Sequence, residues 1–212
     1  LVGFDRFEGK RVLEIGCGLG TDLLQYARGG ALVTGIDLTP KSVELAKAHF
    51  ALRNILLHAL VADAENLPFD DNSFDVVYSF GVLHHTPNTE KAFDEAYRVL
   101  KPGGTIIVML YHKHSLHVYL GAPLYWLSGK VGSGRLSAID DFIRIYDGTE
   151  NPLGRAYSRT EARRMMKQFS NLRVSFCDPI RRKYSRTANA VNQTLFARWL
   201  GFWMVLKGEK LP

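Results

Sequence analysis

The order of hydrophobic and polar positions in the first half of the chain predicts alternating strands and helices. Short apolar runs end at turn residues, as buried strands do, and segments with apolar residues at helical spacing separate them. The expected strands are 11–15, 31–36, 56–61, 74–80 and 105–110, and the expected helices are 21–29, a segment begun by Thr39 and Pro40, and 89–99. This alternation indicates an α/β fold whose parallel sheet has helices on both faces.

The second half of the chain is less regular. Residues 111–157 hold seven aromatic residues and six glycines, so we expect an insertion of short helices and loops without sheet. Ser158 and Glu161 have the spacing of a capping box, which predicts a helix to about Gln168. Residues 172–177 and 202–206 are expected to be the sixth and seventh strands, with 180–200 helical in part.

Composition is typical of a globular protein with its own hydrophobic core. Hydrophobic residues make up 46% of the 212, enough for a sizeable core, and no apolar run reaches the roughly 18 residues of a membrane span. Charges scattered through the first eleven residues argue against a signal peptide. Cys17 and Cys177 are interpreted as reduced thiols, so we expect a cytoplasmic protein, with peripheral membrane association as an open alternative.

The net charge of +6 is unevenly distributed. Residues 1–150 carry 14 Lys/Arg and 18 Asp/Glu, whereas residues 151–212 carry 13 Lys/Arg and 3 Asp/Glu. Two interpretations stay open. The basic end could bind an anionic substrate, an acidic carrier protein or an anionic lipid surface, or it could be an ordinary solvated face.

A glycine-rich turn after the first strand is the strongest chemical signal. Gly16, Gly18 and Gly20 allow a tight turn that approaches a ligand closely, at the positive end of the next helix. The dinucleotide pattern G-x-G-x-x-G would need glycine where this chain has Thr21. Glu14 just before the turn would repel a pyrophosphate but could hold the ammonium of a methionine-like group.

Two acidic positions follow the next two strands. Asp37 ends the second strand, where a carboxylate can accept hydrogen bonds from both hydroxyls of a ribose. Asp63 follows the third strand, and its side chain together with the backbone N–H of Ala64 can recognise the edge of an adenine. The alternative for Asp37 is a helix-capping role.

Five motifs in one order together resemble a known family. EIGCGLGTD, GIDLT, ADAENLPFDDNSFDVV, GVLHH and RVLKPGG resemble the class I S-adenosylmethionine-dependent methyltransferases, in particular the small-molecule branch of ubiquinone/menaquinone-type enzymes. The resemblance covers about residues 9–110 and continues weakly to the last two strands. It implies a Rossmann-like fold with a seven-stranded, mostly parallel sheet. We expect one domain over 1–212, with a cofactor-binding core at 9–110, a lid insertion at 111–157 and a C-terminal part at 158–212.

The resemblance also implies roles for individual positions. The expected contacts with S-adenosyl-L-methionine are Glu14 at the amino end, Gly16, Gly18 and Gly20 around the methionine part, Asp37 at the ribose, Leu38, Asp63 and Ala64 at the adenine, and Phe80 near the methyl group. Asp75 is expected to have a structural role, because it lies at the opposite end of the sheet.

Histidines supply the candidate catalytic groups. His84 and His85 follow the fourth strand, and an imidazole there could remove a proton from the methyl acceptor. The alternative is that both histidines shape the loop and pack against the cofactor. His112, His114 and His117 match no standard zinc spacing and have no accompanying Cys or carboxylate cluster, so we expect no metal site.

The acceptor is expected to be a small or lipid-like molecule. The Asn/Asp-Pro-Pro-Tyr pattern typical of many base-modifying methyltransferases is absent after the fourth strand, and nucleic acid is not favoured as a partner. The alternatives are a nucleic-acid or protein methyltransferase that uses the basic C-terminal third, an NAD-dependent oxidoreductase, and a non-catalytic cofactor-binding subunit.

Overall fold

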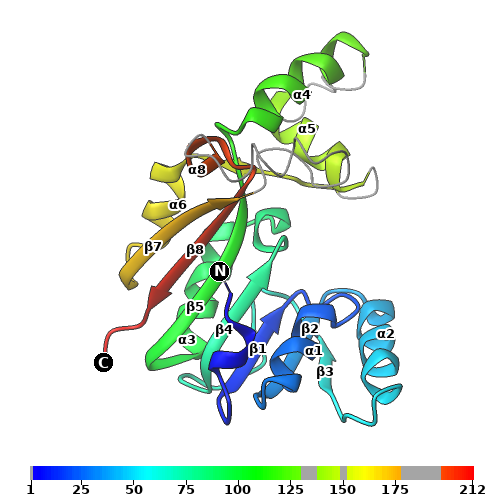
Figure 1. The fold of residues 1–212 in the computed structure, drawn as a ribbon, viewed down its shortest axis with the longest axis vertical. Coiled ribbons are helices and arrows are strands. Elements are labelled where there is room, and N and C mark those ends of the chain that lie inside the picture. The colour runs from blue at the N-terminus through cyan, green and yellow to red at the C-terminus, as the bar shows by residue number, and fades with distance from the viewer. Residues whose placement is uncertain (1, 130–137, 149–151, 178–196) are drawn as a thin grey trace.

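The computed structural model describes residues 2–129, 138–148, 152–177 and 197–212 (Figure 1). Its strands are β1 (Arg11–Ile15), β2 (Leu32–Asp37), β3 (His58–Val61), β4 (Phe74–Phe80), β5 (Leu100–His112), β6 (Ala156–Tyr157), β7 (Ser170–Cys177) and β8 (Trp203–Glu209). Its α-helices are α1 (Thr21–Arg28), α2 (Pro40–Ala51), α3 (Thr89–Val99), α4 (Leu116–Leu127), α5 (Ala138–Asp147), α6 (Arg159–Met165) and α8 (Ala197–Leu200). Two short 3₁₀ helices are η1 (Phe4–Arg6) and η2 (Leu83–His85).

The strands form one sheet in the order β3-β2-β1-β4-β5-β8-β7. Strands β1 to β5 run parallel, and β8 is antiparallel to both β5 and β7. The seven predicted strands and the mostly parallel α/β sheet are therefore confirmed.

The insertion departs from its prediction, because it is not free of sheet. Strand β5 continues to His112, and β6 pairs with its last two residues, Tyr111 and His112. The reason is a free edge: β4 pairs with β5 only as far as Met109, so the last residues of β5 have no partner on that side until β6 supplies one.

Buried residues on successive positions of the strands face opposite sides of the sheet. One face packs Leu13, Val77 and Ile106 against α3 and α6, and the other packs Val12, Val76 and Ile107 against Tyr26 of α1 and the buried sides of α4 and α5. Helices cover both faces, as predicted. Further buried side chains fix α1 against α2, around Leu23 and Phe50.

Helix ends follow the local chemistry of the sequence. The Thr39 hydroxyl accepts a hydrogen bond from the Ser42 N–H at 3.3 Å, and Pro40 is the first residue of α2. The capping box of Ser158 and Glu161 begins α6 as predicted. The helix ends at Met165, earlier than expected, because the chain turns there and leads into β7.

Figure 1 shows α4 and α5 at one end of the molecule, beyond the end of β5. These two helices approach closely at Gly121, where an added Cβ would lie 2.6 Å from the Phe142 ring. Five large apolar side chains of α4 remain exposed: Tyr119, Leu120, Leu124, Trp126 and Leu127. Among the described residues, no helix is both long and apolar enough to cross a membrane.

The partly helical segment expected at 180–200 is described only at its end, where α8 is found. The basic residues Arg181, Arg182, Lys183 and Arg186 lie outside the described residues.

Candidate active site

A cavity of about 560 Å³ lies where the parallel strands end. Open α/β sheets bind ligands at this edge, where the loops that follow the strands meet. Its wall includes residues that directly follow β1, β2, β3 and β4, and it also includes the last residue of α5: Gly16, Asp37, Leu38, Asp63, Ala64, Gly81, Val82, His85 and Asp147.

The structure places six of the predicted site residues on this wall and five elsewhere. Gly16, Asp37, Leu38, Asp63, Ala64 and His85 line the cavity. The predicted residues that do not line it are Glu14, Gly18, Gly20, Phe80 and His84. Their positions in the fold explain what each contributes.

The glycines shape the turn after β1. At Gly16, φ is +78° and a Cβ would lie 2.2 Å from the Val82 side chain, so a larger residue would push the turn off the loop that follows β4. The Gly18 N–H donates to Asp37 Oδ2 at 3.0 Å. Gly20 is the left-handed N-cap of α1 and packs against Phe50. The turn thus fixes Asp37 at the edge of the cavity.

The two acids after β2 and β3 retain capacity to accept hydrogen bonds from a ligand. Asp37 Oδ1 accepts from the backbone N–H and the hydroxyl of Thr39, both at 3.0 Å, and Asp63 Oδ1 accepts from the Glu65 N–H at 2.9 Å. Each carboxylate oxygen can accept more than one hydrogen bond. Beside them Leu38 leaves 71% of its surface exposed at the cavity, which suits the flat face of an apolar ring.

Glu14 is buried behind the wall, with 4% of its surface exposed. Its Oε2 has no hydrogen-bond partner among the described residues. Burial raises the pKa of this carboxyl well above its ordinary value, and the neighbouring Asp22 raises it further. A buried acid with an unused oxygen fits a cationic group such as an ammonium.

Phe80 packs inside the fold. Its ring lies 5.4 Å from that of Trp203 and 6.2 Å from that of Tyr78. At the end of β4 the cavity wall is instead formed by the next two residues, Gly81 and Val82.

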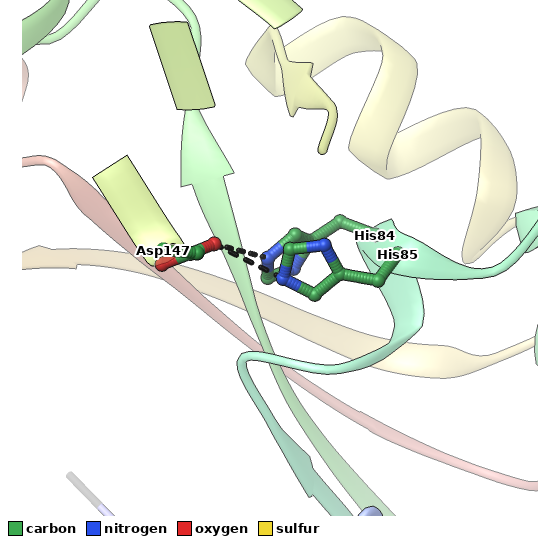
Figure 2. A group of neighbouring side chains, drawn as sticks. All are labelled: His84, His85 and Asp147. Carbon is green, nitrogen blue, oxygen red and sulfur yellow. Dashed lines mark ion pairs between the residues drawn. The ribbon is translucent and has the colours of Figure 1, made fainter. Parts of the chain in front are cut away.

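Two histidines and one aspartate lie together (Figure 2), and His85 and Asp147 of this group line the cavity. Oδ2 of Asp147 lies 3.0 Å from His85 Nε2 and 3.6 Å from His84 Nε2. His85 Nδ1 lies 2.5 Å from the Leu153 carbonyl oxygen, and the Tyr111 hydroxyl donates to Asp147 Oδ1 at 2.5 Å. Asp147 is the candidate site residue that sequence reasoning missed, because no local pattern marks the last residue of α5.

Burial and charge act differently on the three groups. Burial lowers the pKa of His84 to about 4, so this imidazole is neutral near pH 7. Burial also lowers the pKa of His85, but the Asp147 carboxylate and the Leu153 carbonyl outweigh it, and the net pKa is raised. Burial raises the pKa of Asp147, but its contacts with both histidines and Tyr111 lower it more, so this carboxyl is ionised.

The other histidine group does not form a comparable cluster. Within the described part of the chain, His84, His85 and Asp147 are the one set of three metal-binding side chains whose ligand atoms all lie within 4.8 Å of one another. His112 Nδ1 lies 3.1 Å from the Gly201 carbonyl oxygen, and His114 Nδ1 lies 3.1 Å from the Tyr119 hydroxyl.

Comparison with known protein families identifies the domain formed by the first half of the chain. Residues 13–108 match the model of the methyltransferase domain family. The chain is 40% identical over 103 residues to the sterol 4-C-methyltransferase strm-1 of Caenorhabditis elegans, an alignment that covers 48% of this chain and 31% of that protein. Residues 13–108 therefore form a methyltransferase domain, in agreement with the resemblance of their motifs to the class I S-adenosylmethionine-dependent enzymes. The oxidoreductase alternative is therefore set aside.

A second curated relative and a solved structure are also similar to this chain. A phthiotriol/phenolphthiotriol dimycocerosates methyltransferase of Mycobacterium leprae is 42% identical over 98 residues, which are 45% of this chain and 36% of that protein. The chain thus spans about a third of the length of these two curated relatives. Among solved structures, the YcgJ protein of Bacillus subtilis shares the fold at a TM-score of 0.66 and 20% identity, covering 98% of this chain and 95% of that one.

The cofactor of the domain is S-adenosyl-L-methionine. The residues present fit this group, because acids that can hold a ribose and an adenine line the cavity and an acid with an unused buried oxygen lies behind the turn after β1.

Proposed function

We propose that the protein transfers a methyl group from S-adenosyl-L-methionine to a small-molecule or lipid-like acceptor. The observation that carries this proposal is the continuity of one cavity. Asp37 and Asp63 line one part of it, and Gly81, His85 and Asp147 line another. A cofactor held by the two acids would have its reactive end beside His85, with room for an acceptor.

Bound S-adenosyl-L-methionine supplies an activated methyl group on a sulfonium. The residues of this chain therefore have to orient an acceptor and accept its proton. His85 is the candidate for contact with the acceptor, since it lines the cavity. His84 has no exposed surface and could act only through its neighbours.

The class of acceptor is inferred from two observations. Two relatives are named for a sterol and for phthiotriol dimycocerosates, which are hydrophobic molecules. The exposed side of α4 is apolar, and α4 packs on α5, whose last residue, Asp147, lines the cavity. A hydrophobic acceptor could bind to this apolar surface. Methylation of nucleic acid or protein and a non-catalytic role are the competing outcomes of the test.

Calorimetry tests cofactor binding and a methyl-uptake screen tests transfer. We expect S-adenosylhomocysteine to bind and NAD not to bind. The variant Asp37→Ala should weaken binding by about 1.5–3 kcal/mol for each charge-assisted hydrogen bond lost. Asp70→Ala, at a loop acid outside the cavity, is the control and should bind as the unaltered protein does. Tight NAD binding without a response to S-adenosylhomocysteine would sink the proposal.

The screen measures transfer of a labelled methyl group to sterols, polyketide-like lipids, small phenols, RNA and a protein mixture. Uptake by a hydrophobic small molecule supports the proposed acceptor class. Uptake confined to RNA or protein, or no uptake with any acceptor despite cofactor binding, contradicts it.

A further inference from the structure

Several buried polar atoms beside the cavity have no hydrogen-bond partner among the described residues. These are both ring nitrogens of His84, which has no exposed surface, and Oδ2 of Asp147. Leaving polar atoms buried and unpaired destabilises a fold, so such atoms point to a ligand that pairs with them. Nε2 of His84 and Oδ2 of Asp147 lie close to each other and to Nε2 of His85 (Figure 2).

The separations of these atoms suit a shared metal ion. The distances from Asp147 Oδ2 are 3.0 Å to His85 Nε2 and 3.6 Å to His84 Nε2, and the ligand atoms all lie within 4.8 Å. Bonds of 2.0–2.1 Å in a tetrahedral zinc site place neighbouring ligand atoms roughly 3.3 Å apart. We propose that His84, His85 and Asp147 bind a divalent transition-metal ion, for which Zn²⁺ is the best match.

The surrounding contacts orient two of the three ligands for this purpose. Histidines that bind metal through one nitrogen usually donate the other N–H to a carbonyl or carboxylate. His85 Nδ1 faces the Leu153 carbonyl in this way, which leaves Nε2 toward the cluster. The Tyr111 hydroxyl occupies Oδ1 of Asp147 and leaves Oδ2 for the ion.

An ion pair between His85 and Asp147 is the simpler alternative. It explains the 3.0 Å contact, but among the described residues no donor meets hydrogen-bond geometry at Oδ2. It also leaves both nitrogens of His84 without a hydrogen-bond partner in the described part of the chain. A metal ion satisfies Oδ2 and one of these nitrogens at once.

The ion would have one side toward the cavity, because His85 and Asp147 line the wall and His84 lies behind them. Three protein ligands and an open position are typical of catalytic zinc. Its role in the reaction rests on the proposed function, with the ion in place of His85 as the group that contacts the acceptor, because His85 Nε2 would bind the ion. An acceptor hydroxyl bound there would lose its proton to water, and its oxygen would attack the methyl carbon. The carbon–sulfur bond would break with its electron pair left on sulfur.

The test uses the full chain, freed of metal by a chelator, and Co²⁺ and Zn²⁺ as probes. Co²⁺ binding is followed by visible absorption, Zn²⁺ binding by calorimetry, and folding by circular dichroism. The variants are His84→Phe, which keeps an aromatic ring in the buried site, and Asp147→Asn, which keeps an acceptor for Tyr111. His114→Phe is the control at a histidine outside the cluster.

We expect one Co²⁺ per chain with the intense absorption of a four-coordinate site, and a Zn²⁺-dependent rise in the melting temperature. Both variants should lose these signals while remaining folded, and His114→Phe should keep them. Absence of one-to-one binding in the unaltered protein, or equal binding in both variants, would overturn the proposal and leave the ion pair. S-adenosylhomocysteine binding, measured separately in every variant, reports on the proposed function independently of the metal.

Discussion

At the residue scale, Glu14 is a buried acid that we propose pairs with the amino end of the cofactor. Burial and the nearby carboxylates of Asp22 and Asp37 raise the pKa of its carboxyl, and one oxygen has no hydrogen-bond partner among the described residues. A cationic group placed beside it would favour the ionised form. The cost of burying Glu14 would then be offset only when the cofactor is bound.

This argument predicts that cofactor affinity depends on pH through Glu14. In the free protein the pKa is raised, so at low pH the carboxyl is neutral and must lose its proton before it can pair with the ammonium. The affinity for S-adenosylhomocysteine should therefore increase as the pH rises through the free-state pKa of Glu14. Calorimetry at several pH values, in buffers of different ionisation enthalpy, would measure both the affinity and the released proton.

The variant Glu14→Gln is the comparison for this prediction. It keeps the shape of the side chain and removes its titration, so binding should be weaker at high pH and should lose most of the pH dependence. Identical pH profiles in the two proteins would assign the dependence to another group.

At the element scale, the strands and helix caps could be predicted from sequence because their signals are local. Short apolar runs that end at turn residues mark the strands. The helix caps at Thr39 and Ser158 depend on residues three positions away. The acids Asp37 and Asp63 could be found in the same way, since Asp37 ends β2 and Asp63 comes two residues after the end of β3.

Asp147 could not be found from local signals. It reaches the cavity because α5 packs on α4, and the two helices meet where Gly121 lets the Phe142 ring approach. His85 and Asp147 are far apart in sequence, so no local pattern predicts that they are in contact. The expectation of no metal site was based on His112, His114 and His117, which do not include the cluster that the structure assembles.

The packing of α4 on α5 predicts the effect of a substitution far from the chemistry. Gly121→Leu would place side-chain atoms inside the volume of the Phe142 ring and displace α5, and with it Asp147. We expect the free energy of unfolding to fall by about 1–3 kcal/mol, as in other overpacked cores. Co²⁺ binding and methyl transfer should be lost, while S-adenosylhomocysteine binding at Asp37 and Asp63 should be nearly unchanged.

Leu120→Ala is the control, because the side chain next to Gly121 is 60% exposed and does not separate the helices. Denaturant unfolding, calorimetry and the Co²⁺ spectrum would measure the three quantities. If folded Gly121→Leu loses S-adenosylhomocysteine binding together with the Co²⁺ signal, then the prediction is wrong and α5 is also needed for cofactor binding.

At the scale of the whole molecule, charge and apolar surface are both unevenly distributed. The last 62 residues carry 13 of the 27 basic residues and only 3 of the 21 acids. The exposed side of α4, at one end of the molecule, carries five large apolar side chains and no charge (Figure 1). Basic charge combined with exposed apolar side chains is what an anionic membrane surface selects.

The last prediction is that the protein binds anionic vesicles in a salt-sensitive manner and does not bind neutral ones. Each basic residue near an anionic surface contributes about 1 kcal/mol, so four or five acting together give measurable binding. Sedimentation with phosphatidylglycerol and phosphatidylcholine vesicles, at low and moderate salt, would measure it.

Two double variants separate the contribution of charge from that of apolar surface. Arg181→Glu with Arg182→Glu should weaken binding mainly at low salt. Leu120→Ser with Leu124→Ser should weaken binding at both salt concentrations, because apolar contacts are not screened. Leu52→Ser, at an exposed leucine after α2, is the matched control and should bind normally. Equal recovery with both kinds of vesicle, or with neither, would leave the basic end as ordinary solvated surface or a site for a small anion.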